Sequence, residues 1–291
     1  MTVLEAIQRS TQFLNDKGVE NARLQAELLL AHLLRVPRMR LYLNFERALS
    51  SAEIDSLRAW IQRRGQREPL QYIIGSTSFC GLELAVNPDA LIPRPETELL
   101  AEQGWIFLNG EPSASFRSAL DFGTGAGCLA IALAAKCPAA RIQALDISPK
   151  ALELARQNAT HLGVAERILF IQGDGLEALP DDSRFDLIIT NPPYIPTAEI
   201  QKLEPEVRDH EPRQALDGGP DGLDFFRRLA AQAGLFLKPG GKLMAEFGDG
   251  QAQPLAELFE QQNWIVESAL TDYTQRPRII ILRAEHGKPL D

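Results

Sequence analysis

The 291-residue sequence lacks several features that would place it in a specialised class of proteins. It has no run of about 18 apolar residues, so we expect no transmembrane helix. Its three cysteines show no C-x-x-C spacing, which argues against a disulfide framework and against a zinc site. Its four histidines are scattered, and no metal centre is expected. The first residues show no basic stretch followed by an apolar core, so we expect a cytoplasmic protein without a secretory leader.

Positive charge is scarce in most of the chain, whose net charge is −9. The first 70 residues carry a net charge of +3, and the remainder carries −12. The acidic remainder argues against a large duplex-DNA footprint, which normally needs a basic stripe. The weakly basic N-terminal part could contact RNA or an acidic protein surface, or it could be an ordinary solvated helical face.

Residues 1–70 are predicted to form a small helical domain. The stretch 22–34 contains strong helix formers throughout, with leucines at helical spacing. Ser50 and Glu53 form a capping-box pattern ahead of an apolar stretch, which predicts a helix that ends near Gly65.

Residues 71–95 are predicted to be a linker built from a β-hairpin. The stretches 72–75 and 79–82 alternate in hydrophobicity and are punctuated by glycine, a pattern typical of short strands joined by a turn. The linker would separate the helical domain from a larger domain at 96–291.

The larger domain is predicted to be an α/β fold with a mostly parallel, Rossmann-like sheet and helices on both faces. Apolar stretches of strand length alternate there with stretches of helix length. The predicted strands are 118–122, 141–145, 168–172, 185–190 and 241–247, followed by two β-rich segments at 264–270 and 278–282. The predicted helices are 96–108, 128–136, 149–162 and 223–236. In such sheets, ligands bind at the carboxyl ends of the strands.

A glycine-rich turn follows the first of these strands and opens a helix. It consists of Gly123, Thr124, Gly125, Ala126 and Gly127. The glycines allow a tight turn and a close approach of the backbone to a ligand, but their spacing is one residue short of the dinucleotide pattern. Asp121, just ahead of the turn, would repel a pyrophosphate and attract an ammonium group. These features favour S-adenosyl-L-methionine, which carries an amine and a cationic sulfur.

Two further aspartates end the next two strands. Asp146 could accept hydrogen bonds from both ribose hydroxyls of a nucleoside, and Asp174 could accept one from an adenine amino group. The alternative for each is a helix N-cap. Because polar residues end four successive strands, capping alone is a poor explanation, and we predict that both aspartates lie in the nucleoside site.

The strand predicted at 185–190 is followed by Asn191, Pro192, Pro193 and Tyr194. The prolines have no N–H and hold the preceding residues extended, so the segment offers carbonyl oxygens, an amide and an aromatic ring. Such a row of acceptors could bind both hydrogens of a planar NH2 group without blocking the nitrogen lone pair. Alternatively, the tetrapeptide is a turn that ends the strand.

Together these motifs resemble those of class I S-adenosylmethionine-dependent methyltransferases that act on planar nitrogen. Nearly the whole chain resembles, beyond that core, the bacterial peptide chain release factor glutamine methyltransferase (PrmC/HemK) family. The matching segments are 22–29, 68–73, 91–98, 191–194, 211–219 and the glycine-rich turn. The related ribosomal-protein glutamine methyltransferases carry Ser-Pro in place of Pro95-Glu96, so this chain resembles the release-factor branch.

The resemblance implies an enzyme of translation termination. Its substrate would be the glutamine of the Gly-Gly-Gln motif in class 1 peptide chain release factors, methylated on the side-chain amide nitrogen (N5). A seven-stranded class I methyltransferase sheet would form the catalytic domain. The N-terminal helical domain would recognise the substrate.

The resemblance also implies roles for individual residues. Asn191 and the backbone oxygen of Pro192 would accept the two amide hydrogens, with Pro193 beside them and Tyr194 packed on the flat amide. Asn191 would border the cofactor as well. Gly175 stands where some members of the family have an aromatic residue, so any cofactor contact there would be made by its backbone.

Two other functions fit parts of the sequence. An N6-adenine nucleic-acid methyltransferase would share the 191–194 motif but would need a basic groove, and we expect no direct nucleic-acid binding. A non-catalytic adaptor with a vestigial methyltransferase fold would not need intact acceptors. Two local roles also stay open: the segment 211–219 is a lid or a surface loop, and Arg94 is a docking contact or an ion-pair donor.

Overall fold

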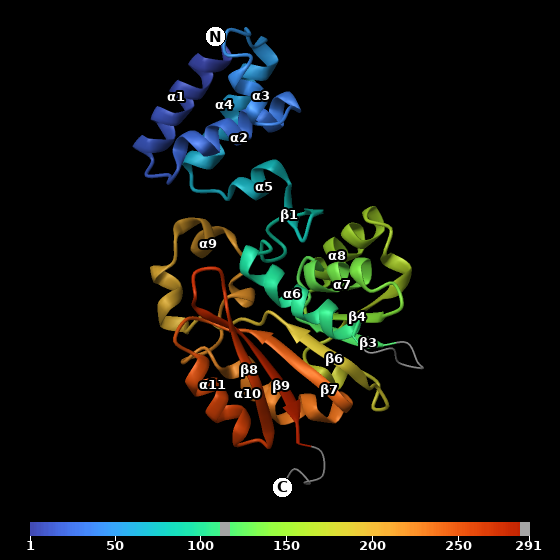
Figure 1. Cartoon of the computed structure of the whole chain (residues 1–291). Coiled ribbons are helices and arrows are strands. Elements are labelled where there is room, and N and C mark those ends of the chain that lie inside the picture. Colours follow the sequence, from blue (N-terminus) through green and yellow to red (C-terminus); the bar gives the residue numbers. More distant parts are fainter. Residues whose placement is uncertain (111–116, 286–291) are drawn as a thin grey trace. The chain divides into compact units, whose positions relative to one another are not determined.

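Figure 1 shows the computed structural model of the chain, which describes residues 1–110 and 117–285. The chain folds into two compact units. The first comprises Met1–Ser76 together with Glu204–His210, and the second comprises Thr77–Leu203 and the chain from Glu211 onward. No local sequence pattern set the segment 204–210 apart, yet by its contacts it groups with the N-terminal helices.

The first unit is built from helices. They are α1 (Val3–Asp16), α2 (Ala22–Leu34), α3 (Met39–Tyr42), α4 (Ser51–Gly65), α5 (Leu70–Ile74) and α9 (Pro205–His210). The predicted helix at 22–34 is confirmed, and the predicted capping box at Ser50 begins α4. Leu14 of α1, Leu29 and Leu30 of α2, and Leu57 of α4 share one buried cluster. Burial of these apolar side chains stabilises the helices against each other.

A buried ion pair joins the two stretches of chain in this unit. The side chain of Arg64 is 4% exposed and is bonded to Glu206 of α9. Arg67 donates to the same carboxylate, with 2.6 Å between Nη2 and Oε2. Because a buried guanidinium needs a partner, Glu206 holds α9 to the end of α4.

The predicted β-hairpin exists but is shorter than expected. Its strands are β1 (Ser76–Phe79) and β2 (Leu82–Ala85), which pair as a two-stranded sheet. The prediction that 72–74 belongs to a strand is wrong, since these residues lie in α5, which ends at Gly75 with φ of +85°. Tyr72 and Ile73 are buried there. Tertiary burial therefore overrides the β preference of these side chains, and five residues are too few to reveal a helical period.

In residues 117–285 the second unit has one sheet of seven strands. They are β3 (Ser118–Phe122), β4 (Arg141–Asp146), β5 (Ile168–Gln172), β6 (Phe185–Thr190), β7 (Leu237–Glu246), β8 (Trp264–Thr271) and β9 (Pro277–Ala284). Their order is β5-β4-β3-β6-β7-β9-β8, with the pairs from β5 to β7 parallel and β9 antiparallel to both of its neighbours. The prediction of a mostly parallel Rossmann-like sheet is confirmed.

In the described part of this unit, one α-helix precedes the sheet and four lie between its strands along the chain. They are α6 (Pro95–Leu108), α7 (Cys128–Lys136), α8 (Pro149–His161), α10 (Asp224–Gln232) and α11 (Ala252–Glu260), and α11 was not predicted. Short 3-10 helices lie at η1 (Ala165–Arg167), η2 (Leu176–Ala178), η3 (Thr197–Lys202), η4 (Arg213–Ala215) and η5 (Ala233–Phe236). Throughout 1–110 and 117–285, no helix combines the length and the apolar character needed to cross a bilayer.

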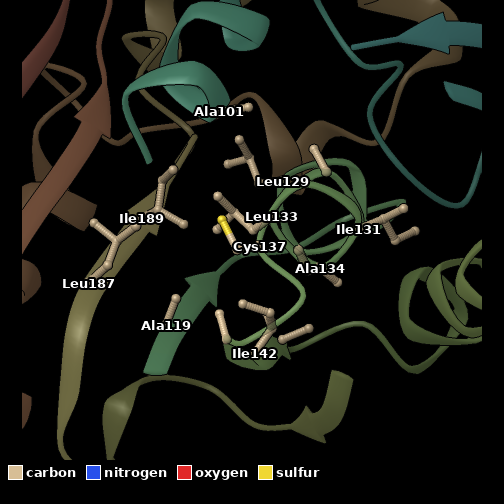
Figure 2. Close-up of a cluster of buried hydrophobic side chains, with 14 of the residues drawn as sticks. Ala101, Ala119, Leu129, Ile131, Leu133, Ala134, Cys137, Ile142, Leu187 and Ile189 are labelled. Carbon is tan, nitrogen blue, oxygen red and sulfur yellow. The ribbon is translucent and has the colours of Figure 1, made fainter. Parts of the chain in front are cut away.

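Alternate residues of each strand enter two different cores. In β3, Ala119 packs in the cluster that contains α6 and α7, whereas Leu120 packs in the cluster that contains α10 and α11. Figure 2 shows the first cluster, with Leu133 of α7 beside Leu187 and Ile189 of β6. In the central strands β3 and β6 this period of two leaves both faces of the sheet buried, so the ends of these strands are the part that can form a site.

Candidate active site

A cavity of about 590 Å³ lies at the carboxyl ends of the parallel strands in the second unit. The residues that follow β3, β4, β5 and β6 all contribute to its wall: 122–126, 146–148, 173–175, Asn191 and Pro193. The structure thus brings together the four strand ends that the sequence singled out. The volume suits a ligand of nucleoside or cofactor size.

The glycines of the glycine-rich turn have two different roles: two of them line the cavity, and the third lies between packed helices. Gly123 and Gly125 line the cavity, and a Cβ atom added at either would meet no atom within 4 Å. Gly127 does not line the cavity. A Cβ there would lie 3.0 Å from both Ala155 of α8 and Ile131 of α7, so this glycine permits the close packing of the two helices.

Asp121 lies behind the glycine-rich turn and does not line the cavity. The expected direct contact with an ammonium group is therefore not available to it in this arrangement. Its Oδ2 atom accepts hydrogen bonds from Thr124 Oγ1 (2.5 Å) and from the backbone nitrogen of Ala130 (3.0 Å). Its Oδ1 atom is buried and has no partner among the described residues. Burial raises the pKa of Asp121 to about 7. The carboxyl group therefore fixes the shape of the turn from beneath.

Asp146 lies on the cavity wall, where the sequence predicted it. Its Oδ2 atom accepts from the backbone nitrogen of Gly125 (2.8 Å), and its Oδ1 atom accepts from that of Ser148 (2.9 Å). The N-cap of α8 is Ser148, so the capping alternative for Asp146 is wrong. Burial raises the pKa of Asp146. Each oxygen keeps lone-pair capacity for a further donor from the cavity.

Asp174 and Gly175 border the cavity together with a residue that the sequence did not indicate, Arg228 of α10. Arg228 Nη1 donates to Asp174 Oδ1 at 3.0 Å, and its Nη2 donates to the backbone oxygen of Asp174 at 3.1 Å. A Cβ atom added at Gly175 would collide with Arg228 and with Glu177. The guanidinium thus fills the space that a side chain at position 175 would need. No spacing signal connects α10 to β5.

The tetrapeptide after β6 faces the cavity only in part. Asn191 and Pro193 line it, while Pro192 is buried and does not. Tyr194 is also absent from the wall: its hydroxyl donates to Glu246 Oε1 (3.2 Å), and its ring packs against the buried cluster of α10 and α11. In this arrangement the ring is therefore not placed to cover a substrate amide.

A buried polar chain behind Asn191 was missed by the sequence reasoning. Asn191 Nδ2 donates to Thr97 Oγ1 (2.9 Å), and Thr97 Oγ1 donates to Glu246 Oε2 (2.6 Å). Thr97 is 1% exposed and Glu246 is 2% exposed. Burial raises the pKa of Glu246, while the hydrogen bonds from Thr97 and Tyr194 act in the opposite direction. A carboxylate at the end of the otherwise apolar stretch 243–247 was the available signal.

The segment 211–219 forms another part of the cavity wall. Pro212, Gln214, Ala215, Asp217, Gly218 and Gly219 line the cavity. One end is held by Glu211, whose side chain is 1% exposed and accepts a 2.6 Å bond from Arg94. Toward the other end, Asp217 accepts from Thr197 Oγ1 at 2.5 Å. Arg94 is thus an ion-pair donor. The segment 211–219 forms part of the cavity wall and is not a detached surface loop.

The sheet order and the ligand-sized cavity define a Rossmann-like α/β fold with a candidate binding site at the carboxyl ends of its parallel strands. Two solved structures support the fold. A methyltransferase from Pyrococcus furiosus has a TM-score of 0.51 at 20% identity, over 71% of this chain and 91% of that one. The catalytic domain of hMettl16, in complex with an RNA hairpin, has a TM-score of 0.55 at 17% identity over 83% of each chain.

Sequence comparison gives the family. Residues 5–75 match the PrmC N-terminal domain family, and residues 104–204 match the methyltransferase small domain family. The release factor glutamine methyltransferase of Geobacter sulfurreducens is 45% identical over 260 residues, or 89% of each chain. That of Caulobacter vibrioides is 38% identical over 281 residues, 97% of this chain and 96% of the other. The chain belongs to the release factor glutamine methyltransferase family and is a methyltransferase.

Proposed function

We propose that this chain transfers a methyl group from S-adenosyl-L-methionine to the N5 atom of the glutamine in the Gly-Gly-Gln motif of class 1 peptide chain release factors. The names of the relatives support the substrate class. The observation that carries the proposal is the placement of the Asn191 amide. Its nitrogen is bonded to Thr97, and Asn191 lies on the wall of the cavity beside the glycine-rich turn.

The residues of the cavity fit S-adenosyl-L-methionine. Asp146 offers two carboxylate oxygens for the ribose hydroxyls, and Asp174 lies at the neighbouring strand end for the adenine. Gly123 and Gly125 leave open space where other residues would have a Cβ atom. When bound, this cofactor supplies an electrophilic methyl group on a cationic sulfur. Asp121 would act on it only through the shape of the turn.

The chain's own residues would favour the reaction by orientation and by charge stabilisation. A glutamine amide is a poor nucleophile because its lone pair is delocalised into the carbonyl group, and no side-chain base removes its proton at neutral pH. Asn191 Oδ1 would accept one amide hydrogen. The resemblance to the family implies the backbone oxygen of Pro192 as the second acceptor, but Pro192 does not line the cavity, so the proposal rests on Asn191. Its hydrogen bond strengthens as positive charge develops on the nitrogen, so it stabilises the transition state more than the bound substrate.

The helical domain at 1–70 would recognise the release factor, as the family match over 5–75 supports. Its net charge of +3 contrasts with −12 for the rest of the chain, which suits contact with an acidic protein face. A substrate of this kind places the enzyme in the cytoplasm.

The test is methylation of a folded class 1 release factor by the full-length protein with S-adenosyl-L-methionine. We expect one methyl group on the glutamine of Gly-Gly-Gln, located by fragmentation mass spectrometry. A release factor with that glutamine replaced by asparagine is the matched control and should gain none. Methyl transfer to DNA or RNA, with none to the release factor, would overturn the proposal.

A further inference from the structure

Asn191 is connected to a buried carboxylate through a single hydroxyl group. The amide nitrogen of Asn191 contacts Thr97 Oγ1, and that oxygen contacts Glu246 Oε2. These residues come from three separate elements: the end of β6, the first turn of α6 and the end of β7. The second carboxylate oxygen of Glu246 is bonded to the hydroxyl of Tyr194. All four residues belong to the second unit.

The number of hydrogens on these four side chains determines which group donates in each hydrogen bond. Burial raises the pKa of Tyr194, so its hydroxyl keeps its proton and donates to Glu246. The second oxygen of Glu246 receives the hydroxyl of Thr97, so the ionised carboxylate satisfies both donors. Thr97 has only one hydrogen, and it is used. Its oxygen can therefore only accept from Asn191, which requires the NH2 group of that amide to face Thr97.

The same count of hydrogens determines which atom of the Asn191 amide faces the cavity. With its nitrogen held by Thr97, its Oδ1 atom is at the opposite end of the amide. Among the described residues no group donates to this oxygen, and Asn191 lines the cavity. A flipped amide would instead present donors, which an incoming NH2 group cannot use.

We propose that Thr97 and Glu246 are positioning residues that hold the Asn191 amide with its oxygen toward the substrate. This rests on the proposed function, because Asn191 Oδ1 is the acceptor for the glutamine NH2 group. Neither residue needs to touch the substrate nitrogen. Their effect is on turnover, through the orientation of one amide.

The proposal predicts a loss of turnover at low pH. Protonated Glu246 would have a hydrogen of its own for Thr97, which could then donate to the amide oxygen and favour the flipped amide. The titratable or charged groups that face Glu246 are Tyr194, Glu96 of α6, Arg278 of β9 and Cys128 of α7. Because the first and largest effect on Glu246 is burial, its protonation falls at a higher pH than that of an ordinary glutamate.

The decisive comparison is Thr97→Val against Thr97→Ser in the full-length protein. Valine keeps the shape and removes the hydroxyl, so we expect kcat for the release factor to fall by about 10–10²-fold. The dissociation constant for S-adenosylhomocysteine, measured by calorimetry, should stay within about twofold of the wild-type value. Serine restores the hydroxyl and should recover most of kcat. Thr160→Val removes an exposed hydroxyl bonded to Arg156 and serves as the control.

Two further readouts separate positioning from a general structural role. The acid limb of the kcat profile should disappear in Glu246→Gln, which cannot be ionised. In 1H–15N spectra of the protein without substrate, the Asn191 side-chain NH2 signals should shift with the titration of Glu246 in the wild type and not in Thr97→Val. This spectrum reads the amide even if the release factor proves not to be the substrate.

Wild-type turnover in Thr97→Val would overturn the proposal, as would a loss of cofactor affinity that matches the loss of kcat. Asn191 NH2 signals that are insensitive both to pH and to the loss of the Thr97 hydroxyl would also overturn it. Absence of any methylation by the wild-type protein would count against the proposed function alone.

Discussion

Asp146 accepts a hydrogen bond of 2.8 Å from the backbone nitrogen of Gly125, so one carboxylate links the end of β4 to the turn that follows β3. The same side chain lines the cavity. Asp146→Ala should raise the dissociation constant for S-adenosylhomocysteine by roughly 10–100-fold, the usual effect of losing hydrogen bonds to a charged group. Turnover at saturating cofactor should change little. Asp249→Ala, at an exposed ion pair, is the control, and an unchanged constant in Asp146→Ala would remove this residue from the ribose role.

Asn191→Ala should lower kcat for the release factor by about 10²–10³-fold, because it removes a preorganised acceptor at the developing charge. Cofactor affinity should be retained, as measured by calorimetry with S-adenosylhomocysteine. Asn109→Ala alters an exposed amide bonded to Lys136 and should leave both quantities unchanged. Normal turnover with weakened cofactor binding would instead assign Asn191 to the nucleoside site.

Arg228→Ala should weaken binding of S-adenosylhomocysteine by about 3–10-fold, since a guanidinium beside an aromatic base contributes roughly 1 kcal/mol. The neighbouring Arg227 pairs with Asp221 and Asp224 and does not line the cavity, so Arg227→Ala is the control. The loss should be equal for 5′-methylthioadenosine, which lacks the amino-acid part. A loss confined to S-adenosylhomocysteine would place Arg228 at the other end of the ligand.

The stability of the protein without cofactor should fall as the pH rises from about 4 to about 7, because of Asp121. Its pKa is raised by burial from 3.8 to about 7, so the folded protein holds a proton in this range that the unfolded chain has released. The expected change in the free energy of unfolding is on the order of 3 kcal/mol. Asp121→Asn should flatten this dependence in urea titrations. A slope in the variant as steep as in the wild type would contradict the assignment.

Arg64→Ala should destabilise the protein by about 3 kcal/mol, because it leaves the partly buried carboxylate of Glu206 without one of its partners. Arg58→Ala breaks an ion pair in which both side chains are more than 60% exposed, and it should cost less than about 0.5 kcal/mol. Chemical denaturation followed by circular dichroism measures both. Equal effects of the two substitutions would show that Glu206 contributes nothing specific.

Regular elements of the larger domain could be predicted from sequence because their periods are strong. The bounds of β3 and β6 agree with the prediction at both ends, since strands buried between two layers of helices show long apolar runs. The helix α11 was not predicted, and its sequence contains Pro254, a residue that disfavours a helix interior. In the structure this proline lies in the first turn of α11, where no backbone donor is needed.

The site was predictable where a residue's position along a strand decides its role, and not where a distant residue does. Asp146 and Asn191 follow strands that end at the same edge of the sheet, so they share the cavity. Thr97 and Glu246 are 149 residues apart in the chain, and no local pattern connects them. The placement of Asp121 was available in principle, because strand alternation puts it on the same face as Ala119, toward α7.

The helical unit is closed by a piece of chain that is synthesised long after the rest of it. Glu206 follows Arg64 by 142 residues. Thr197, which precedes its segment in the chain, and Pro212, which follows it, line the cavity. During synthesis, Arg64 therefore lacks the carboxylate of Glu206 until most of the catalytic part has left the ribosome. A truncation at residue 76 would leave Arg64 its hydrogen bonds to Gln25 and to the backbone oxygen of Glu68, but would remove its carboxylate partner.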